Sequence, residues 1–382
     1  MRILFSATPA HGHILPLFPL ARAFRAGHDA VAILTSDALG SAFVGEDIEV
    51  LAAGPGLGEL MGEVIARTGA DPLVGLTPEQ EAEAFAGVRV DLTADVAEAA
   101  ARRWRPDVIV SEHYDFVGPL LGTKLRIPVA TLAFGPAIAP DSAALMASTV
   151  HSRWAARGVQ PKKPDWYLDT CPPALQIDGW ARPQEHMALR PEPHRNPGSP
   201  SQVEAARVHV PEGGARVLVT FGTIFSSPQV LGPIFSELCD AGWEVRATTG
   251  LASTAAEYGA DPNRVTLFEF TPLDELLADI DIAVTHGGAG STLGLLAAGI
   301  PLVVVPQGAD HHIQADRVTA SGAGVSVSPG ASGADIAKAV AQVLGEPSYR
   351  VGAQRIAAEI AALPSPDDIA ARLRAEVTRS NS

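Results

Sequence analysis

A glycine-rich turn between Thr285 and Thr292 carries the strongest chemical signal in the sequence. The apolar run DIAVT (residues 281–285) leads into HGGAG, and Ser291 and Thr292 follow. Glycines let an anion approach the backbone, and the first turn of a helix offers N–H groups without a partner inside the helix. Hydroxyl side chains there can cap the helix or donate to phosphate oxygens. The turn predicts a diphosphate site in which His286 could neutralise charge, although the pattern alone also fits a tight turn without a ligand.

Two histidines near the N-terminus are candidates for a general base. His11 and His13 follow the apolar run of residues 2–7 in the loop AHGHILP. Open α/β sheets place reactive groups in loops at the carboxyl ends of strands. An imidazole with a pKa of about 6.5 can take a proton from a hydroxyl group at neutral pH. Spacing alone leaves both histidines open.

A histidine base needs a carboxylate that fixes its tautomer and stabilises the imidazolium. Glu112 and Asp115 follow the apolar run DVIVS (residues 107–111), and either could be that partner. A solvated glutamate at the end of a strand is the common alternative.

Two further motifs are weaker. Asp279 and Asp281 spell D-x-D, a pattern that holds a divalent metal in some transferases but is short enough to arise by chance. Other potential ligands are Asp310, His311, His312 and Asp316. We expect no metal site. The segment GPGLG (residues 54–58) is a partial dinucleotide fingerprint without the third spacing or a convincing helix start, so we expect a loop.

Short apolar runs alternate with helical patterns in both halves of the chain. The runs cover residues 2–7, 30–35, 49–53, 107–111 and 129–134, and then 216–221, 243–249, 264–270, 281–285 and 301–305. Helical patterns, such as those over residues 78–86, 91–103, 229–241 and 291–298, lie between them. This alternation predicts parallel strands buried between helices. The proline-rich end of the stretch between the halves, residues 191–202, is expected to be an interdomain linker.

Bulk properties exclude several classes of partner. A length of 382 residues favours two domains. The net charge of −15, without a Lys/Arg cluster, argues against nucleic acid. Cys171 and Cys239 are far apart and indicate neither a disulfide framework nor a zinc site. The N-terminal run predicts a strand rather than a signal peptide, and no run reaches the roughly 18 apolar residues that span a bilayer. We expect a cytoplasmic protein without a membrane partner.

Longer strings resemble a known family. Residues 285–318, the TFGT turn at 220–223 and the CPPALQ stretch at 171–176 resemble the GT-B glycosyltransferases, in particular the UDP-glycosyltransferase family with its plant enzymes and bacterial antibiotic glycosyltransferases. The resemblance extends over nearly the full chain. It implies an α/β fold with two Rossmann-like domains facing a deep interdomain cleft. Residues 1–200 would bind the acceptor and residues 201–360 the nucleotide sugar, and a C-terminal helix over 361–382 could cross back to the first domain.

The same resemblance implies roles for individual residues. His13, the histidine that precedes x-x-P, would be the base, and Glu112 its partner, with His11 and Asp115 as the alternatives. The donor-binding residues would be Thr223, His286, Gly287, Gly288, Gly290, Ser291 and Thr292 at the diphosphate, Thr271, Pro272 and Leu273 at the nucleotide base, and Gln307, Asp310 and His311 at the sugar hydroxyls.

The implied reaction is an inverting sugar transfer without metal or other cofactor. A nucleotide diphosphate sugar would be the co-substrate, with a dTDP-deoxysugar favoured over a UDP-sugar, and the acceptor would be a small apolar natural product. Residues 54–75 and 134–154 are expected to build the acceptor pocket. The protein would be a monomer or homodimer. A nucleotide-sugar epimerase of the same fold and a non-catalytic nucleotide-sugar or partner-binding protein are the alternatives, and the first-loop histidine argues against the epimerase.

Overall fold

The chain divides into two compact units. The computed structural model describes residues 1–70, 75–195, 214–250, 255–261, 263–269 and 271–380. The first unit contains residues 1–171, 178–190 and 363–382, and the second contains residues 172–177 and 191–362. The expected domain boundary between residues 200 and 201, and the linker beyond residue 195, lie outside the described residues.

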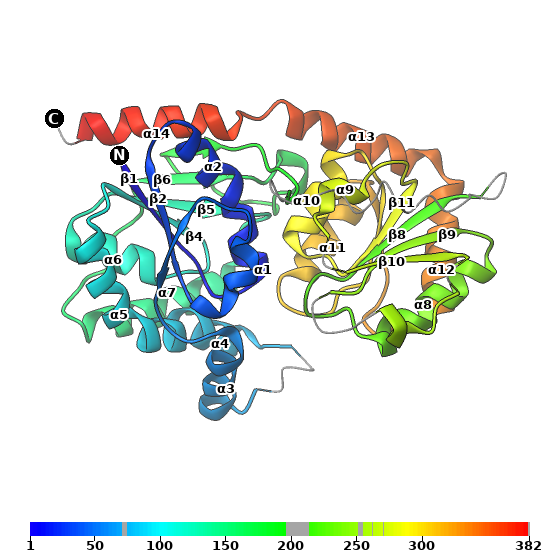
Figure 1. Ribbon diagram of the computed structural model, residues 1–382, viewed down its shortest axis with the longest axis horizontal. Helices are drawn as coiled ribbons and strands as arrows, with labels where there is room; N and C mark the ends of the chain where they lie inside the picture. The colour runs from blue at the N-terminus through cyan, green and yellow to red at the C-terminus, as the bar shows by residue number, and fades with distance from the viewer. Residues whose placement is uncertain (71–74, 196–213, 251–254, 262, 270, 381–382) are drawn as a thin grey trace. The chain divides into compact units, whose positions relative to one another are not determined.

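The first unit is built on a seven-stranded parallel sheet (Figure 1). Its strands are β1 (Arg2–Ser6), β2 (Ala30–Thr35), β3 (Glu49–Ala52), β4 (Val108–Glu112), β5 (Val129–Ala133), β6 (Trp166–Asp169) and β7 (His186–Ala188), in the order β3-β2-β1-β4-β5-β6-β7. Runs such as AVAILT in β2 are almost wholly buried, as expected for strands covered on both faces.

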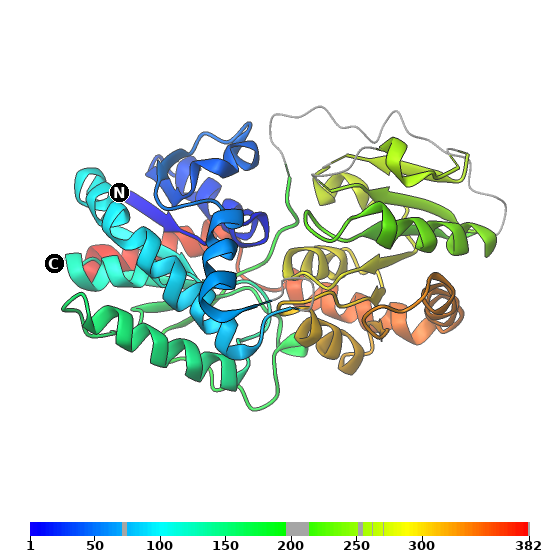
Figure 2. The ribbon, with the colours of Figure 1, turned by 90° about the horizontal axis from the view of Figure 1, so that it is seen from below.

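Helices connect these strands. They are α1 (His11–Ile14), η1 (Leu15–Leu17), α2 (Phe18–Ala26), η2 (Asp37–Phe43), α3 (Leu57–Thr68), α4 (Pro78–Ala82), η3 (Glu83–Val88), α5 (Arg89–Trp104), α6 (Val117–Leu125), α7 (Pro140–Ala155) and α14 (Pro366–Ser380). Figure 2 shows α5 and α7 on the side of the first sheet that faces the viewer. No described helix is both long and apolar enough to span a bilayer.

The second unit repeats the plan with six parallel strands. They are β8 (Arg216–Thr220), β9 (Glu244–Thr248), β10 (Val265–Phe268), β11 (Ile282–Thr285), β12 (Leu302–Val304) and β13 (Gly324–Ser326), in the order β10-β9-β8-β11-β12-β13. The helical segments are η4 (Pro173–Leu175), α8 (Pro228–Asp240), η6 (Ala255–Tyr258), α9 (Leu273–Leu276), α10 (Ala289–Ala297), α11 (His311–Ala320), α12 (Gly333–Gly345) and α13 (Pro347–Ala361). Helices α8 and α12 pack together, as do α10 and α13. Two parallel α/β sheets confirm the expected fold class.

The strand order of each sheet reverses at one point. β1 pairs with β2 on one side and β4 on the other, so the chain leaves β1 in one direction and returns on its opposite edge. β8 pairs with β9 and β11 in the same way. Crossovers of one hand that run in opposite directions leave a crevice at the carboxyl ends of the two central strands. In the first unit the loops after β1 and β4 therefore lie side by side. In the second unit the same holds for the loops after β8 and β11.

Three details differ from the sequence-based expectations. Residues 57–68 form α3 directly after Gly56, so the GPGLG segment leads into a helix rather than a loop alone. A side chain at Gly54 would lie 2.2 Å from the Thr93 hydroxyl, so the glycine is required by this close approach and by its φ of +81°. The expected helices over 78–86 and 91–103 are one continuous helical segment joined by the π-helical turn η3. The stretch before residue 191, for which no strand was expected, holds β6 and β7.

The last helix of the chain packs on α2. α14 contacts α2, and Figure 1 shows the two side by side. The Arg374 guanidinium donates to Asp29 at 2.6 Å and lies over the Phe24 ring, while the N-terminal ammonium group donates to the other Asp29 oxygen at 2.7 Å. The apolar side chains of Leu373 and Val377 are fully buried. α14 therefore contributes core to the first unit.

Shortening one buried side chain of α14 should destabilise the first unit. Leu373→Ala should lower the free energy of unfolding by about 2–4 kcal/mol, because it leaves a cavity in a closed core. Urea denaturation is the measurement, and the exposed neighbour Arg372→Ala is the control, with a change below about 0.5 kcal/mol. Equal stabilities for the two variants would contradict the docking of α14.

Candidate functional site

The loops after β1 and β4 bring a histidine and a buried carboxylate together. Helix α1 begins at His11, directly after the β1 loop, and carries His13 in its single turn. Nδ1 of His13 lies 3.1 Å from Oε1 of Glu112, the last residue of β4. His13 is 18% exposed at its side chain and Glu112 is fully buried. The imidazole therefore has a buried anchor and a face open to solvent.

Glu112 is held as a carboxylate by its surroundings. Burial opposes its ionisation, but the charge of His13 and hydrogen bonds from His13 and from the Tyr114 backbone outweigh that cost, so the pKa of the carboxyl lies below its ordinary value. The backbone N–H groups of Thr8 and Tyr114 donate to it at 3.2 and 2.6 Å. An ionised Glu112 accepts the Nδ1 proton of His13, which leaves the basic lone pair on Nε2.

The rings of Phe85, Tyr114 and Phe134 lie around the imidazole of His13. The centroids of Phe85, Tyr114 and Phe134 lie 5.5, 5.8 and 5.3 Å from the centroid of His13. Tyr114 and Phe134 are buried, whereas Phe85 is half-buried. The expected acceptor segments include Phe134 but neither Phe85 nor Tyr114. Tyr114 follows β4 by two residues, and its position could have been recognised on that ground.

Asp115 has a different partner. It is buried and accepts from the Arg89 guanidinium at 3.3 Å, from the Gly118 backbone at 3.2 Å and from the Ser6 hydroxyl. Arg89, also fully buried, donates to the Ala7 carbonyl at 2.9 Å. The Arg89–Asp115 pair thus ties the β1 loop to the β4 loop. Of the two carboxylates considered for the histidine, Glu112 contacts His13 and Asp115 does not.

In the second unit, His286 fills the space between the loops after β8 and β11. Its Nδ1 lies 3.4 Å from the carbonyl oxygen of Thr220, at the end of β8. A side chain at Gly222 would lie 2.9 Å, and one at Gly288 2.4 Å, from its Nε2. Gly222 also has a φ of +68°, which favours glycine. The two glycines are therefore needed for the imidazole to fit between the loops.

Helix α10 begins directly after this histidine. Its first turn holds Gly290, exposed and without a neighbour within 4 Å of its ideal Cβ position, and the half-buried Ser291. Thr292 is fully buried, and its hydroxyl has no hydrogen-bond partner among the described residues. A helix start with accessible backbone and a spare buried hydroxyl is suited to an anion.

His286 and His311 form a neutral pair. Their rings meet edge to face, with centroids 4.7 Å apart. Burial, with the nearby charge of His311, lowers the pKa of His286 to about 3, and burial, with the charge of His312, lowers the pKa of His311 to about 4. His286 is therefore uncharged at neutral pH. This disfavours the expectation that it supplies positive charge to a diphosphate.

The other expected donor residues lie at the same edge of the second sheet. Thr223 follows β8, Gln307 and Asp310 follow β12, and α11 begins at His311. The amide nitrogen of Gln307 donates to the carbonyl oxygen of Val305 at 3.0 Å. Thr271 is buried after β10 and donates to the Glu269 carbonyl at 2.9 Å, while Pro272 and Leu273 begin α9. The contact with Val305 uses the side-chain nitrogen of Gln307 and leaves the side-chain oxygen able to accept a hydrogen bond from another group.

The D-x-D motif lies elsewhere. Asp279 and Asp281 precede β11, at the edge of the sheet opposite the glycine-rich loop. Asp281 accepts from the Arg216 backbone at 2.9 Å, and Asp279 forms an ion pair with the Arg216 guanidinium at 3.5 Å. Both acids thus have a structural partner. In the part of the chain that the structure describes, no group of three or more His, Cys, Asp or Glu side chains is placed to hold a metal ion.

Sequence comparisons relate the chain to known proteins. The family model for the C-terminal domain of erythromycin biosynthesis protein CIII-like proteins matches residues 236–376. The elloramycin glycosyltransferase of Streptomyces olivaceus is 32% identical over 98% of this chain and 97% of its own length. The L-demethylnoviosyl transferase of Streptomyces niveus is 28% identical, with 98% of each chain covered.

Similar solved structures are also glycosyltransferases. The glycosyltransferase of Streptomyces sp. SF2575 in complex with thymidine diphosphate superposes with a TM-score of 0.81, at 27% identity, over 98% of this chain and 99% of that chain. The glycosyltransferase SnogD of Streptomyces nogalater has a TM-score of 0.79 at 29% identity, with 99% of each chain covered.

The buried histidine pair should make the second unit sensitive to acid. Above about pH 6.5 the folded and unfolded states are both neutral at these rings, and as the pH falls below this value only the unfolded state binds the protons. Stability is therefore lost on acidification, by about 1.4 kcal/mol for each histidine at pH 5.5.

Urea denaturation at pH 7.5 and 5.5 tests this expectation. The wild type should lose about 2–3 kcal/mol more than the double variant His286→Gln, His311→Gln over this interval. His151→Gln, on the surface of α7, is the control and should behave like the wild type. An equal loss in the double variant and the wild type would show that the two imidazoles are not buried in neutral form.

Proposed function

The chain belongs to the GT-B glycosyltransferases of actinobacterial antibiotic biosynthesis, and on this premise we propose that it transfers a deoxysugar from a dTDP-sugar to a hydroxyl group of a small apolar acceptor, with inversion at the anomeric carbon. It is a glycosyltransferase of the type that attaches deoxysugars to natural products, as its relatives are. The His13–Glu112 pair at the reversal point of the first sheet is the observation that carries the proposal.

His13 is proposed to act as the general base. Its Nε2 takes the proton of the acceptor hydroxyl as that oxygen attacks the anomeric carbon of the donor, and the bond from that carbon to the diphosphate breaks with its electron pair on the leaving oxygen. Glu112 remains ionised and stabilises the imidazolium. One displacement with the base on the side opposite the leaving group inverts the anomeric centre. The transfer requires that the hydroxyl at His13 meet the donor held by the second unit.

The first turn of α10 is proposed to hold the diphosphate. Backbone N–H groups at the helix start and the hydroxyls of Ser291 and Thr292 donate to its oxygens, and Thr223 meets it from the β8 loop. Since His286 is neutral, these donors and the helix dipole stabilise the leaving charge, and His286 sets the spacing of the two loops. Gly290 leaves the backbone accessible, whereas Gly287 packs closely against Val304 and His311, and Gly288 makes room for His286. Fixed donors of this kind supply a few kcal/mol each without a metal.

The remaining donor groups are assigned on the same basis. Thr271, Pro272 and Leu273 are proposed to contact the nucleotide base, and Gln307, Asp310 and His311 the sugar hydroxyls. His311 accepts the Gln307 N–H at Nδ1, at 3.3 Å, so its remaining proton lies on Nε2 and can be donated. The thymidine diphosphate bound by the relative from Streptomyces sp. SF2575 supports dTDP as the nucleotide.

The carboxylate of Glu112 should be required for turnover and not for donor binding. Glu112→Gln should lower kcat by about 10²- to 10⁴-fold, because an amide stabilises no imidazolium and can turn the ring to the wrong tautomer. Steady-state release of dTDP from dTDP-rhamnose, a 6-deoxysugar donor, with alizarin as the acceptor, measures kcat and the KM of each substrate. A changed donor KM with an unchanged kcat would contradict the role of Glu112.

The hydroxyl of Thr292 should contribute to nucleotide affinity. Thr292→Val keeps the side-chain volume and removes a hydrogen bond to a charged oxygen, so the Kd for dTDP should rise about tenfold or more. Titration calorimetry in the presence of EDTA measures this affinity and should show no loss for the wild type on metal removal. Thr319→Val, whose hydroxyl donates within α11, is the matched control. An unchanged Kd in Thr292→Val would place the diphosphate elsewhere.

A further inference from the structure

The π-helical turn η3 carries a ring to the histidine base. It lies between α4 and α5, and Phe85 at its third position contacts His13 and Tyr114, with centroid distances of 5.5 and 4.8 Å. A π turn takes one more residue than an α turn, is rare, and is found mostly at functional sites. Without the extra residue the rest of the helix would rotate relative to Phe85. The turn therefore determines where this ring lies.

Ion pairs fix both ends of the turn. Glu83, its first residue, accepts from Arg67 of α3 at 2.9 Å and from Arg153 of α7 at 2.9 and 3.2 Å. Arg89, the residue directly after the turn, donates to Asp115 and to the Ala7 carbonyl. One end is thus tied to the helices around the turn and the other to the loops that hold His13 and Glu112.

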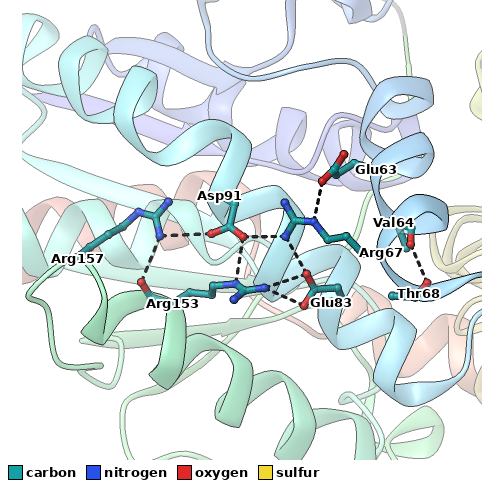
Figure 3. Close-up of polar contacts among 8 residues, drawn as sticks. All are labelled: Glu63, Val64, Arg67, Thr68, Glu83, Asp91, Arg153 and Arg157. Atoms are coloured by element: carbon teal, nitrogen blue, oxygen red, sulfur yellow. Dashed lines mark hydrogen bonds and ion pairs between the residues drawn. The ribbon is translucent and has the colours of Figure 1, made fainter.

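Asp91 joins the ion pairs that Glu83 forms with Arg67 and Arg153. It accepts from Arg67 at 2.8 Å and forms ion pairs with Arg153 at 3.1 Å and Arg157 at 3.4 Å (Figure 3). We call Arg67, Glu83, Asp91, Arg153 and Arg157 the ion cluster; Glu63 touches it through Arg67. These charges are partly buried, and several that share partners act as a network, which is stronger than isolated surface pairs. A side chain at Gly87 would lie 2.4 Å from the Glu83 carboxylate, so the carboxylate lies close over that glycine.

An apolar cluster supports Phe85 from the side of α3. Leu60 and Val64 of α3 pack with Ala84 and Val88 of the turn, and Phe85 packs against this cluster. Of the three rings around His13, Tyr114 and Phe134 are buried, and Phe85 is half-buried. Phe85 therefore presents accessible ring surface next to the base.

We infer that Phe85 is a contact residue for the acceptor, which is a planar aromatic molecule that stacks on this ring and thereby brings its hydroxyl to His13. The ion cluster positions Phe85 and so determines which acceptor molecules bind well. The inference rests on the proposed function, since it takes His13 as the base that meets the hydroxyl. A planar ring system suits the site because ring pairs add attraction beyond the area they bury.

Binding and transfer are measured separately to test it. Alizarin, a planar hydroxyanthraquinone, is titrated into the full-length protein to obtain its Kd, and its glycosylation from dTDP-rhamnose is followed by dTDP release. Phe85→Ala should raise the Kd and the acceptor KM about tenfold and leave the Kd for dTDP unchanged, and Phe85→Tyr should restore both values. The Kd and the acceptor KM for androsterone, a saturated steroid alcohol, should change less than about twofold in Phe85→Ala.

The ion cluster is tested by its own variant. Glu83→Gln should raise the alizarin KM about threefold or more while kcat and the donor KM hold, because the turn loses the charge that anchors Phe85. Glu98→Gln on α5 is the matched control, since Glu98 also binds two cations, Arg102 and Lys124, but lies outside the cluster.

The outcomes separate the two proposals. If alizarin fails to bind the wild type, or binds Phe85→Ala as tightly, the inference is overturned. If Glu83→Gln and Glu98→Gln have the same KM, the positioning role of the ion cluster is overturned. If the wild type binds alizarin through Phe85 yet releases no dTDP in its presence, the binding contact at Phe85 stands, whereas the proposed transfer from a dTDP-deoxysugar, and with it the delivery of the hydroxyl to His13, fails.

Discussion

Two buried carboxylates at the end of β4 set the constraint on which the first unit depends. Glu112 and Asp115 lie within four residues of one another, both almost fully removed from solvent, and an unpaired buried carboxylate costs several kcal/mol. Each must therefore have a cationic or strongly donating partner. Asp115 takes the guanidinium of Arg89, a permanent charge, which holds the loops after β1 and β4 together. Glu112 takes His13, whose charge can change during a reaction. The unreactive pair thus holds in place the loops that carry the reactive one.

The second unit has the same sheet plan but must bind an anion. A nucleotide diphosphate is an anion, and the protein as a whole has a net charge of −15. The residues at the reversal point of the second sheet supply no fixed charge: the His286–His311 pair is neutral, and the α10 helix start offers N–H and hydroxyl groups. Such dipoles attract the diphosphate locally at little cost from the long-range field. Proton transfer is therefore assigned to the first unit and stabilisation of the leaving group to the second.

The sequence predicted the sites better than their surroundings. In a parallel sheet the carboxyl ends of all strands come to the same edge, so runs such as 2–7, 107–111 and 281–285 were enough to place His13, Glu112 and His286 at that edge of their sheets. Resemblance, not spacing, separated His13 from His11. The choice of Glu112 over Asp115 agrees with the contact in the structure, but spacing alone could not make it, because the partner of Asp115 lies 26 residues away in Arg89. The π turn was missed because periodicity does not reveal one extra residue in a helix. β6 and β7 were missed because both are short and lie among prolines, which interrupt the alternating pattern.

The central claim is that His13 takes the acceptor proton while the second unit holds the donor unaided. The most direct test compares the wild type with His13→Ala in a single-turnover reaction of dTDP-rhamnose with alizarin, with the dTDP affinity of both proteins measured by calorimetry. The account predicts that the rate of sugar transfer falls by at least about 10²-fold and that the Kd for dTDP is unchanged. Transfer by His13→Ala at the wild-type rate would contradict it.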